Sequence, residues 1–336
     1  MLLKENKAAE LPPNGEPLNP ADAVAADLRA VEQKMNGLLD SREGLISEIC
    51  HYLIDGSGKR LRPTFILLVY RACGGKEAKV GDAVDAAIAL ELIHNATLLH
   101  DDIIDGGTLR RGKPSAFARF GMGPSLVAGD YLFSRAFELC GRFDERLVRM
   151  AAAACIELTE GEVMEGRFRH NPAVELKDYL AVIHRKTASL FWSGGRVASD
   201  LAGGSPALVD AMGELGTAIG LAFQMVDDLL DVIGPEEKIG KPVGSDLRAG
   251  IPSLPLVLGI KREPELGKIL QNGDATQGDG FERALQLLRT SSVIEEARAM
   301  AAAQVKLART KMSLLKPSIY RDSLATLIDD QINREV

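Results

Sequence analysis

Apolar residues recur at intervals of three and four along most of the chain, the spacing that places them on one face of an α-helix. The first such run covers residues 21–39, with Val24, Leu28, Val31 and Met35 in register. The same pattern predicts further helices over residues 41–54, 63–70, 80–105, 125–141, 145–168, 175–201, 207–232 and 253–261, with two or three more over 276–336. We find no credible strand-turn-strand pattern and no fixed-period repeat. The chain is therefore predicted to be all-α, a single-domain bundle of roughly ten or more helices.

Composition supports this fold class. Aromatic residues make up only 5% of the 336 residues, whereas sandwiches and barrels are enriched in aromatic and β-branched residues. The net charge of −7 argues against a general nucleic-acid-binding role. Basic residues that bind a ligand must therefore form local clusters on an acidic background.

The ends of the chain and its cysteines indicate a cytoplasmic protein. Residues 1–20 contain four prolines and no continuous apolar run, so we expect a flexible tail rather than a secretory signal. The helical domain then covers residues 21–336. No window approaches the ~20 apolar residues that a membrane-spanning helix needs. Four cysteines without a C-x-x-C pair are expected to be reduced and to fill the core.

Two acidic triads share the spacing Asp-Asp-x-x-Asp, each at the end of an apolar helical run. They are Asp101, Asp102 and Asp105, and Asp227, Asp228 and Asp231. Residues four apart lie on one face of a helix, so the outer carboxylates of each triad repel one another unless a cation joins them. Mg²⁺ bridges one or two carboxylates to substrate phosphates. The repeated spacing predicts a Mg²⁺-dependent diphosphate site and disfavours a solvated acidic helix end; the EF-hand spacing is absent.

Clusters of basic residues accompany the triads. They are Lys59, Arg60 and Arg62 in a loop before a helix, Arg110, Arg111 and Lys113 after the first triad, Arg185 and Lys186 after His184, and Lys238 and Lys241 after the second triad. Each cluster alone is typical of a solvated face. Arg binds phosphate through two parallel hydrogen bonds and Lys acts as a point charge. The arrangement suits two polyphosphate groups, one bound through metal and one bound by cations directly.

In this order, His94, residues 100–105, residues 110–112, Phe223-Gln224 and residues 227–231 resemble the polyprenyl synthetase family, the trans-isoprenyl diphosphate synthases. The resemblance runs from the first predicted helix to the C-terminus. It implies the isoprenoid synthase fold, with helices around a central substrate cavity, and head-to-tail condensation of isopentenyl diphosphate with an allylic diphosphate. Terpene cyclases usually differ at the second triad, so its intact form favours chain elongation.

The resemblance also implies a role for each matching residue. Mg²⁺ would be bound by Asp101, Asp102, Asp105, Asp227 and Asp231. Isopentenyl diphosphate would be bound by Lys59, Arg62, His94 and Arg111. The allylic diphosphate would contact Arg110, Lys186, Thr187, Gln224 and Lys241. The catalytic set would be Asp101, Asp105, Asp227, Asp231, Lys186 and Arg110. Outside the motif, His94, Thr187 and Gln224 would be interpreted as ordinary packing residues.

The chain departs from the family pattern at one position, and the size of two residues near the first triad bears on product length. Ile251 stands where many family members have lysine, so the phosphate contact of that lysine is in doubt. Ala96 and Thr97 lie roughly 6–8 Å below Asp101 along the helix, where short-chain members tend to have an aromatic floor. Small residues there predict a long product, C30 or longer, similar to heptaprenyl-type and octaprenyl-type synthases; geranylgeranyl or farnesyl diphosphate synthase is the alternative. Phe133 or Phe137 is a candidate for a deeper floor.

Other functional classes are less well supported. His100-Asp101 is compatible with an HD-type phosphohydrolase, but that class gives the second triad no role. A non-catalytic helical partner subunit would not need intact triads. By resemblance we expect a homodimer, with a small regulatory subunit as an open alternative, and transient membrane contact by the apolar product.

Overall fold

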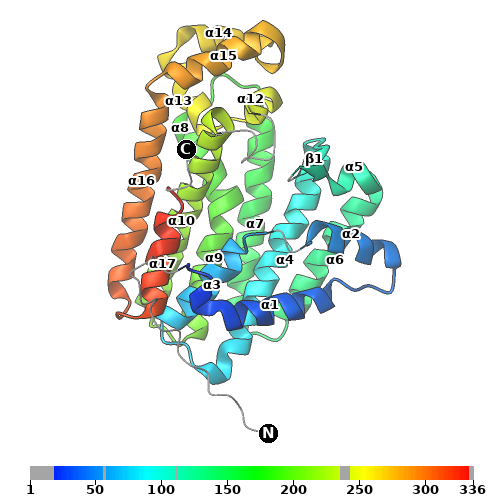
Figure 1. The fold of residues 1–336 in the computed structure, drawn as a ribbon, viewed down its shortest axis with the longest axis vertical. Coiled ribbons are helices and arrows are strands. Elements are labelled where there is room, and N and C mark those ends of the chain that lie inside the picture. The colour runs from blue at the N-terminus through cyan, green and yellow to red at the C-terminus, as the bar shows by residue number, and fades with distance from the viewer. Residues whose placement is uncertain (1–18, 56–57, 111, 235–242, 333–336) are drawn as a thin grey trace.

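The computed structural model describes residues 19–55, 58–110, 112–234 and 243–332, and it is almost entirely helical (Figure 1). The helices are α1 (Ala25–Leu38), α2 (Gly44–Leu53), α3 (Leu61–Ala72), α4 (Val80–Ile104), α5 (Ala116–Phe120), α6 (Met122–Cys140), α7 (Glu145–Phe168), α8 (Leu176–Ile183), α9 (Ser189–Leu201), α10 (Pro206–Ile233), α12 (Ser245–Ala249), α13 (Leu254–Arg262), α14 (Pro264–Gln271), α15 (Gly278–Thr290), α16 (Val293–Lys311) and α17 (Ile319–Asp329). The predicted all-α class is confirmed. Residues 1–18, most of the predicted tail, lie outside the described residues, and the division at residue 20 stays a prediction.

Three local features differ from the predicted pattern. Residues 175–201 do not form one α-helix, because a π-helical turn, His184–Ala188, separates α8 from α9. The short helices α5, α12 and α14 were not predicted. The prediction that the chain has no strand-turn-strand unit was also wrong, since Leu109–Arg110 (β1) and Lys113–Pro114 (β2) pair as a two-residue antiparallel ribbon. Segments this short contain too few residues to show a hydrophobic period.

The longest helices pass through the interior. α4 is buried on almost all sides, as its nearly uninterrupted apolar sequence requires. One apolar cluster packs α4 with α3, α6, α9 and the first half of α10. A second cluster packs the last part of α10 with α8, α13, α15 and α16. α10 therefore links both clusters, and its C-terminal end lies where they meet.

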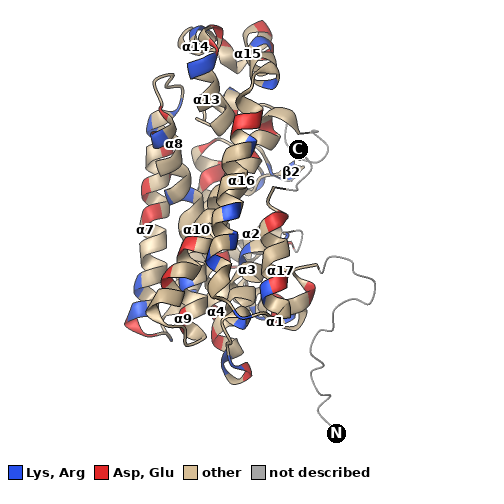
Figure 2. Ribbon diagram, turned by 90° about the vertical axis from the view of Figure 1, so that its left-hand side faces the viewer, with Lys and Arg blue, Asp and Glu red and all other residues tan. Residues whose placement is uncertain are grey.

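The arrangement of the helices brings chemically important ends together. In Figure 1, α4, α7, α9 and α10 lie alongside one another, and α12 to α15 cover the upper end. The two acidic triads end α4 and α10 on the side of the molecule that carries the ribbon and α12. Acidic and basic residues are interspersed along the outer helices in Figure 2. Within the described residues, no helix has the length and hydrophobicity that crossing a membrane requires.

All four cysteines are free thiols. Cys50 and Cys140 are buried, and Cys73 and Cys155 are partly buried. Burial raises the pKa of the Cys50 thiol to about 12, because a thiolate is poorly solvated in an apolar interior. The prediction that the cysteines fill the core is confirmed.

Candidate active site

The first acidic triad projects its outer carboxylates toward α7. Asp101 is partly buried, and burial, reinforced by Glu162 and Asp105 and opposed by Lys186 and Arg110, raises the pKa of this carboxyl to about 7. Asp105 is paired with the guanidinium of Arg169, which follows α7. The predicted common face of Asp101 and Asp105 therefore exists and already faces cations.

Asp102 has a different environment. It is 4% exposed, and both of its oxygens accept hydrogen bonds from Arg110: Nε lies 3.0 and 2.9 Å from Oδ1 and Oδ2, and Nη2 lies 2.8 Å from Oδ1. A bidentate pair of this kind is specific and strong. Asp102 thus fixes the β1–β2 ribbon against the end of α4. This contact disfavours, without testing it, the metal-ligand role predicted for Asp102.

The middle residue of the second triad also has a structural role. Asp228 is buried and accepts three hydrogen bonds, from the Tyr179 hydroxyl at 2.8 Å, Gln224 Nε2 at 2.9 Å and the Leu254 backbone N–H at 2.9 Å. Burial raises the pKa of the Asp228 carboxyl to about 7, although these three donors lower it. The carboxyl joins α8, α10 and the start of α13 behind the site.

The outer residues of the second triad differ in exposure. Asp227 is partly exposed and lines a pocket. Asp231 is 1% exposed and accepts hydrogen bonds from the Ser245 hydroxyl at 2.6 Å and the Asp246 backbone N–H at 3.1 Å. Asp231 therefore holds the first turn of α12 against α10. Its predicted metal-ligand role stays untested, and the buried position gives it less access to a ligand than Asp227 has.

Lys186 connects the two triads. Its Nζ lies 2.7 Å from Glu165 Oε1 and 2.8 Å from Glu162 Oε2, both on α7. Burial alone would lower the pKa of Lys186. The negative charges of Glu165, Asp101 and Glu162 together raise it by more than burial lowers it, so the net shift is upward. The same lysine lines a pocket of about 200 Å³ with Glu165, Asp227 and Asp228. A cation permanently charged at neutral pH thus lies between carboxylates from α4, α7 and α10.

The π-helical turn explains how Lys186 reaches this position. A π turn inserts one residue into a helix and is frequent at functional sites. The backbone of α7 approaches it closely, because a Cβ on Gly161 would lie 2.6 Å from the Lys186 backbone nitrogen. Thr187, the next residue, donates its hydroxyl to Gln224 Oε1 at 2.8 Å. The predicted contacts Lys186, Thr187 and Gln224 therefore lie together in one pocket.

The three basic residues around the start of α3, Lys59, Arg60 and Arg62, have different environments. Arg60, in a left-handed conformation with φ 47°, pairs with Glu32 and lies 3.5 Å from Glu91. Lys59 is exposed. The Arg62 guanidinium lies 5.0 Å from the centre of the Phe191 ring, and its buried Nε has no hydrogen-bond partner among the described residues. Burial lowers the pKa of Arg62, partly offset by Glu91 and Asp227.

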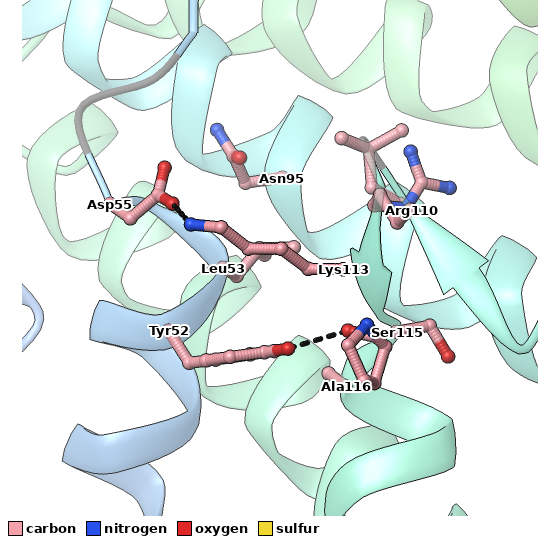
Figure 3. Close-up of a pocket in the computed structure, with 10 residues that line it drawn as sticks. Tyr52, Leu53, Asp55, Asn95, Arg110, Lys113, Ser115 and Ala116 are labelled. Carbon is pink, nitrogen blue, oxygen red and sulfur yellow. Dashed lines mark hydrogen bonds and ion pairs between the residues drawn. The ribbon is translucent and has the colours of Figure 1, made fainter. Parts of the chain in front are cut away.

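A second pocket, of about 220 Å³, lies between α2, α4 and the ribbon (Figure 3). Lys113 Nζ and Asp55 Oδ2 point toward each other at 2.6 Å. The Tyr52 hydroxyl donates to the Pro114 carbonyl at 2.6 Å. Arg110 lines the same pocket, so α2 and α4 together hold the ribbon that carries this predicted diphosphate ligand.

Residues 43–288 match the family model described as polyprenyl synthetase. The chain belongs to the polyprenyl synthetase family.

The relatives of this polyprenyl synthetase carry names from both ends of the product range. The short chain isoprenyl diphosphate synthase of Methanothermobacter thermautotrophicus is 36% identical over 294 residues, covering 84% of this chain and 89% of the relative. The octaprenyl diphosphate synthase of Escherichia coli is 32% identical over 320 residues, covering 94% and 98%. A crystal structure of polyprenyl synthase from Caulobacter crescentus, complexed with calcium and isoprenyl diphosphate, has a TM-score of 0.89 at 32% identity, covering 95% of this chain and 98% of that chain.

The donor set of this polyprenyl synthetase fits a hard divalent cation bound jointly with phosphate. Carboxylate oxygens are the ligands that Mg²⁺ prefers, with the remaining positions filled by water and substrate phosphates. No three acidic, His or Cys side chains in the described part of the chain form a ready-made metal cage. Asp105 is paired with Arg169, and Glu165 is paired with Lys186. The orphaned Nε of Arg62 is a donor available to a phosphate oxygen.

Several predicted residues remain without a tested role. Arg111 and Lys241 lie outside the described residues. His94 is partly buried on α4, and Ile251 lines the Lys186 pocket with an apolar side chain. The sequence pattern did not predict a role for Glu162, Glu165, Arg169 or Tyr179. For the two glutamates, the spacing of polar residues three and four apart along α7 was the available signal. Phe137 is 54% exposed in the single chain, which disfavours it as an internal floor.

Proposed function

We propose that this chain is a Mg²⁺-dependent trans-polyprenyl diphosphate synthase that condenses isopentenyl diphosphate head to tail with an allylic diphosphate. The supporting observation is the position of Lys186, with Glu162 and Glu165 on one side and Asp101 and Asp227 nearby. This arrangement gives one diphosphate a cation and two carboxylate clusters that can share metal ions with it.

The proposed mechanism assigns each group a part in separating charge. Bound Mg²⁺ supplies Lewis-acid stabilisation of the negative charge on the departing diphosphate. Lys186 and Arg110 add preorganised positive charge at the same leaving group. The C1–O bond of the allylic substrate breaks, and the double bond of isopentenyl diphosphate attacks the resulting carbocation at C1. Loss of a proton to the released diphosphate then forms the new double bond.

The homoallylic substrate is proposed to bind on the α3 side of the site. Arg62 offers an unpartnered buried Nε there, and the Phe191 ring covers its guanidinium. Lys59 precedes α3 by two residues, and His94 is part of α4. We expect Arg62→Ala to raise the KM for isopentenyl diphosphate more than the KM for the allylic substrate.

The direct test incubates the purified chain with Mg²⁺, farnesyl diphosphate and labelled isopentenyl diphosphate. We expect labelled polyprenyl diphosphate, abolished by a chelator and by Asp101→Ala or Asp227→Ala in folded protein. Activity that persists after chelation would refute the proposal. The same incubation shows whether the chain acts alone or needs a second, smaller subunit.

We further propose a product of C30 or longer. Ala96 and Thr97 are both small and buried on α4, so the growing tail meets no aromatic side chain at these positions. Relatives named octaprenyl and nonaprenyl diphosphate synthase support a long product, whereas relatives named short chain and geranylgeranyl synthase support the alternative. Chromatography of the extracted product separates the two, and Ala96→Phe in folded protein should shorten it.

The structure disfavours an HD-type phosphohydrolase. His100 faces α6, with its ring 3.2 Å from the Leu126 carbonyl and 5.9 Å from the Phe133 ring. Asp101 instead interacts with Lys186 and Glu162. The two side chains thus face different elements and do not share one metal position.

We propose a homodimer that contacts its second copy through α6. Exposed large apolar side chains gather on this helix: Met122, Leu126, Val127 and Phe137. Burying such side chains between copies is favourable. Val127→Asp should convert a dimer to a monomer in analytical ultracentrifugation. The cytoplasm stays the expected location, with transient membrane contact during product release.

A further inference from the structure

Arg169 follows the last turn of α7, and its guanidinium reaches the first acidic triad. It pairs with Asp105 and lies 3.9 Å from Glu165 Oε1. The side chain is 21% exposed, so solvent screens these pairs only partly. Arg169 therefore occupies an oxygen of the same Asp105 carboxylate that is proposed to bind metal.

The guanidinium also has an unused donor. Arg169 Nε is buried, and no hydrogen-bond partner for it exists among the described residues. Buried donors are nearly always partnered in folded proteins, and an N–H of a charged guanidinium forms its strongest bonds with carboxylate and phosphate oxygens. The orphaned Nε therefore indicates an additional acceptor that arrives with a ligand.

The backbone holds Arg169 at this place. The next residue, His170, has φ 54° and donates its N–H to the Gly250 carbonyl at 2.9 Å. A Cβ on Gly250 would lie 2.2 Å from His170 Nδ1, so only glycine permits this close contact. The following residue, Ile251, lines the Lys186 pocket. The turn after α7 is thus docked on the loop that contains Gly250 and Ile251, and this loop forms part of the wall of the Lys186 pocket. Because position 251 is isoleucine, the loop supplies no cation there.

We propose that Arg169 is an exchangeable counter-ion of the first acidic triad, an inference that rests on the function proposed above. Before substrate binds, Arg169 neutralises Asp105. When metal and diphosphate bind together, metal takes the Asp105 carboxylate and the Arg169 guanidinium moves to a diphosphate oxygen. Metal alone competes with Arg169, whereas metal with diphosphate gives Arg169 a new acceptor. Arg169 thereby couples metal binding to the presence of a diphosphate.

The experiment measures Mn²⁺ binding directly, by the electron paramagnetic resonance signal of free hydrated Mn²⁺, with and without inorganic pyrophosphate. The variants are Arg169→Gln and, as a matched control, Arg167→Gln, which removes an equal charge from an exposed position two residues earlier, in the last turn of α7. We expect Arg169→Gln to bind Mn²⁺ alone about fivefold or more tightly, within the usual range for coupled sites. Its additional gain with pyrophosphate should shrink by a similar factor. Arg167→Gln should match the wild type, and Arg169→Lys should lie between.

Two results would overturn the proposal. Weaker Mn²⁺ binding by folded Arg169→Gln, with and without pyrophosphate, would mean that Arg169 only orients Asp105. Unchanged binding under both conditions would mean that the contact has no functional role. Wild-type protein that binds no Mn²⁺ even with pyrophosphate would instead refute the proposed function, so the two failures are distinguishable.

Discussion

Replacing Lys186 by methionine tests the electrostatics of the site most directly. Methionine keeps most of the apolar stem and removes the ammonium. In the wild type, Nζ lies 2.7 Å from Glu165 and 2.8 Å from Glu162, and the three side chains are only 21%, 11% and 13% exposed. The substitution therefore leaves two nearly buried carboxylates without their cation, and Asp101 loses the charge that lowers its pKa.

The magnitude follows from this burial. Removing one partner of a buried ion pair costs about 3–5 kcal/mol. Burial already raises the pKa of Glu165 above its ordinary value of 4.5. Protonation of Glu165 can therefore remove part of the cost of an unpaired buried charge. We expect the free energy of unfolding to fall by an amount near the lower end of this range, about 3 kcal/mol at pH 7.5. A raised folded-state pKa means that the folded variant binds more protons than the unfolded chain. The variant is then most stable relative to wild type below pH 4.5 and loses that relative stability as pH rises through the raised pKa.

The assay is urea unfolding without metal, followed by fluorescence of Trp192, the single tryptophan. Lys177→Met is the control, because Lys177 pairs with Glu175 at an exposed site where an ion pair contributes little. We expect Mg²⁺ to restore more stability to Lys186→Met than to wild type, since the cation replaces the missing charge. A Lys186→Met protein as stable as the control at pH 7.5 would refute the reasoning.

Three further predictions concern packing and burial around the site. Gly161→Ala should lower the free energy of unfolding by about 1–3 kcal/mol and reduce turnover, because its Cβ would lie 2.6 Å from the Lys186 backbone nitrogen; Gly166→Ala, with open space around it, should be neutral or stabilising in the same urea titration. Tyr179→Phe removes a buried donor to Asp228 and should cost about 1.5–3 kcal/mol by urea titration. Cys50, with a thiol pKa of about 12, should react with a disulfide reagent at pH 8 only when the protein unfolds, as measured by mass spectrometry.

Much of the fold is local in origin and was therefore predictable. The apolar periods of α4, α7 and α10 extend over many turns, so the predicted ranges 80–105, 145–168 and 207–232 agree with the observed helices to within a residue. α4 and α10 bury most of their apolar positions, which is why sequence spacing and structure coincide there. The two-residue ribbon and the five-residue helix α12 are held by side-chain contacts with Asp102 on α4 and Asp231 on α10, and the local apolar pattern does not reveal these contacts.

The candidate site divides in the same way. The repeated spacing of the triads was sufficient to predict that Asp101 and Asp105 share a face and that α4 and α10 end in carboxylates. It could not show that Asp102, Asp228 and Asp231 direct their oxygens to protein donors, because the spacing within a triad does not reveal which donors the fold places beside each carboxylate.

The sequence by itself determined the helices and the acidic ends of α4 and α10, since each depends on residues close together in the chain, and it determined the family through the order of several motifs. Only the tertiary structure decided which carboxylates face the pocket and which cations oppose them. The close approach of α7 to the π turn brings Lys186 between Glu162 and Glu165, and the turn after α7 brings Arg169 to Asp105. The physical reason is that Coulomb interaction depends on distance and burial, which packing sets and spacing in the chain does not.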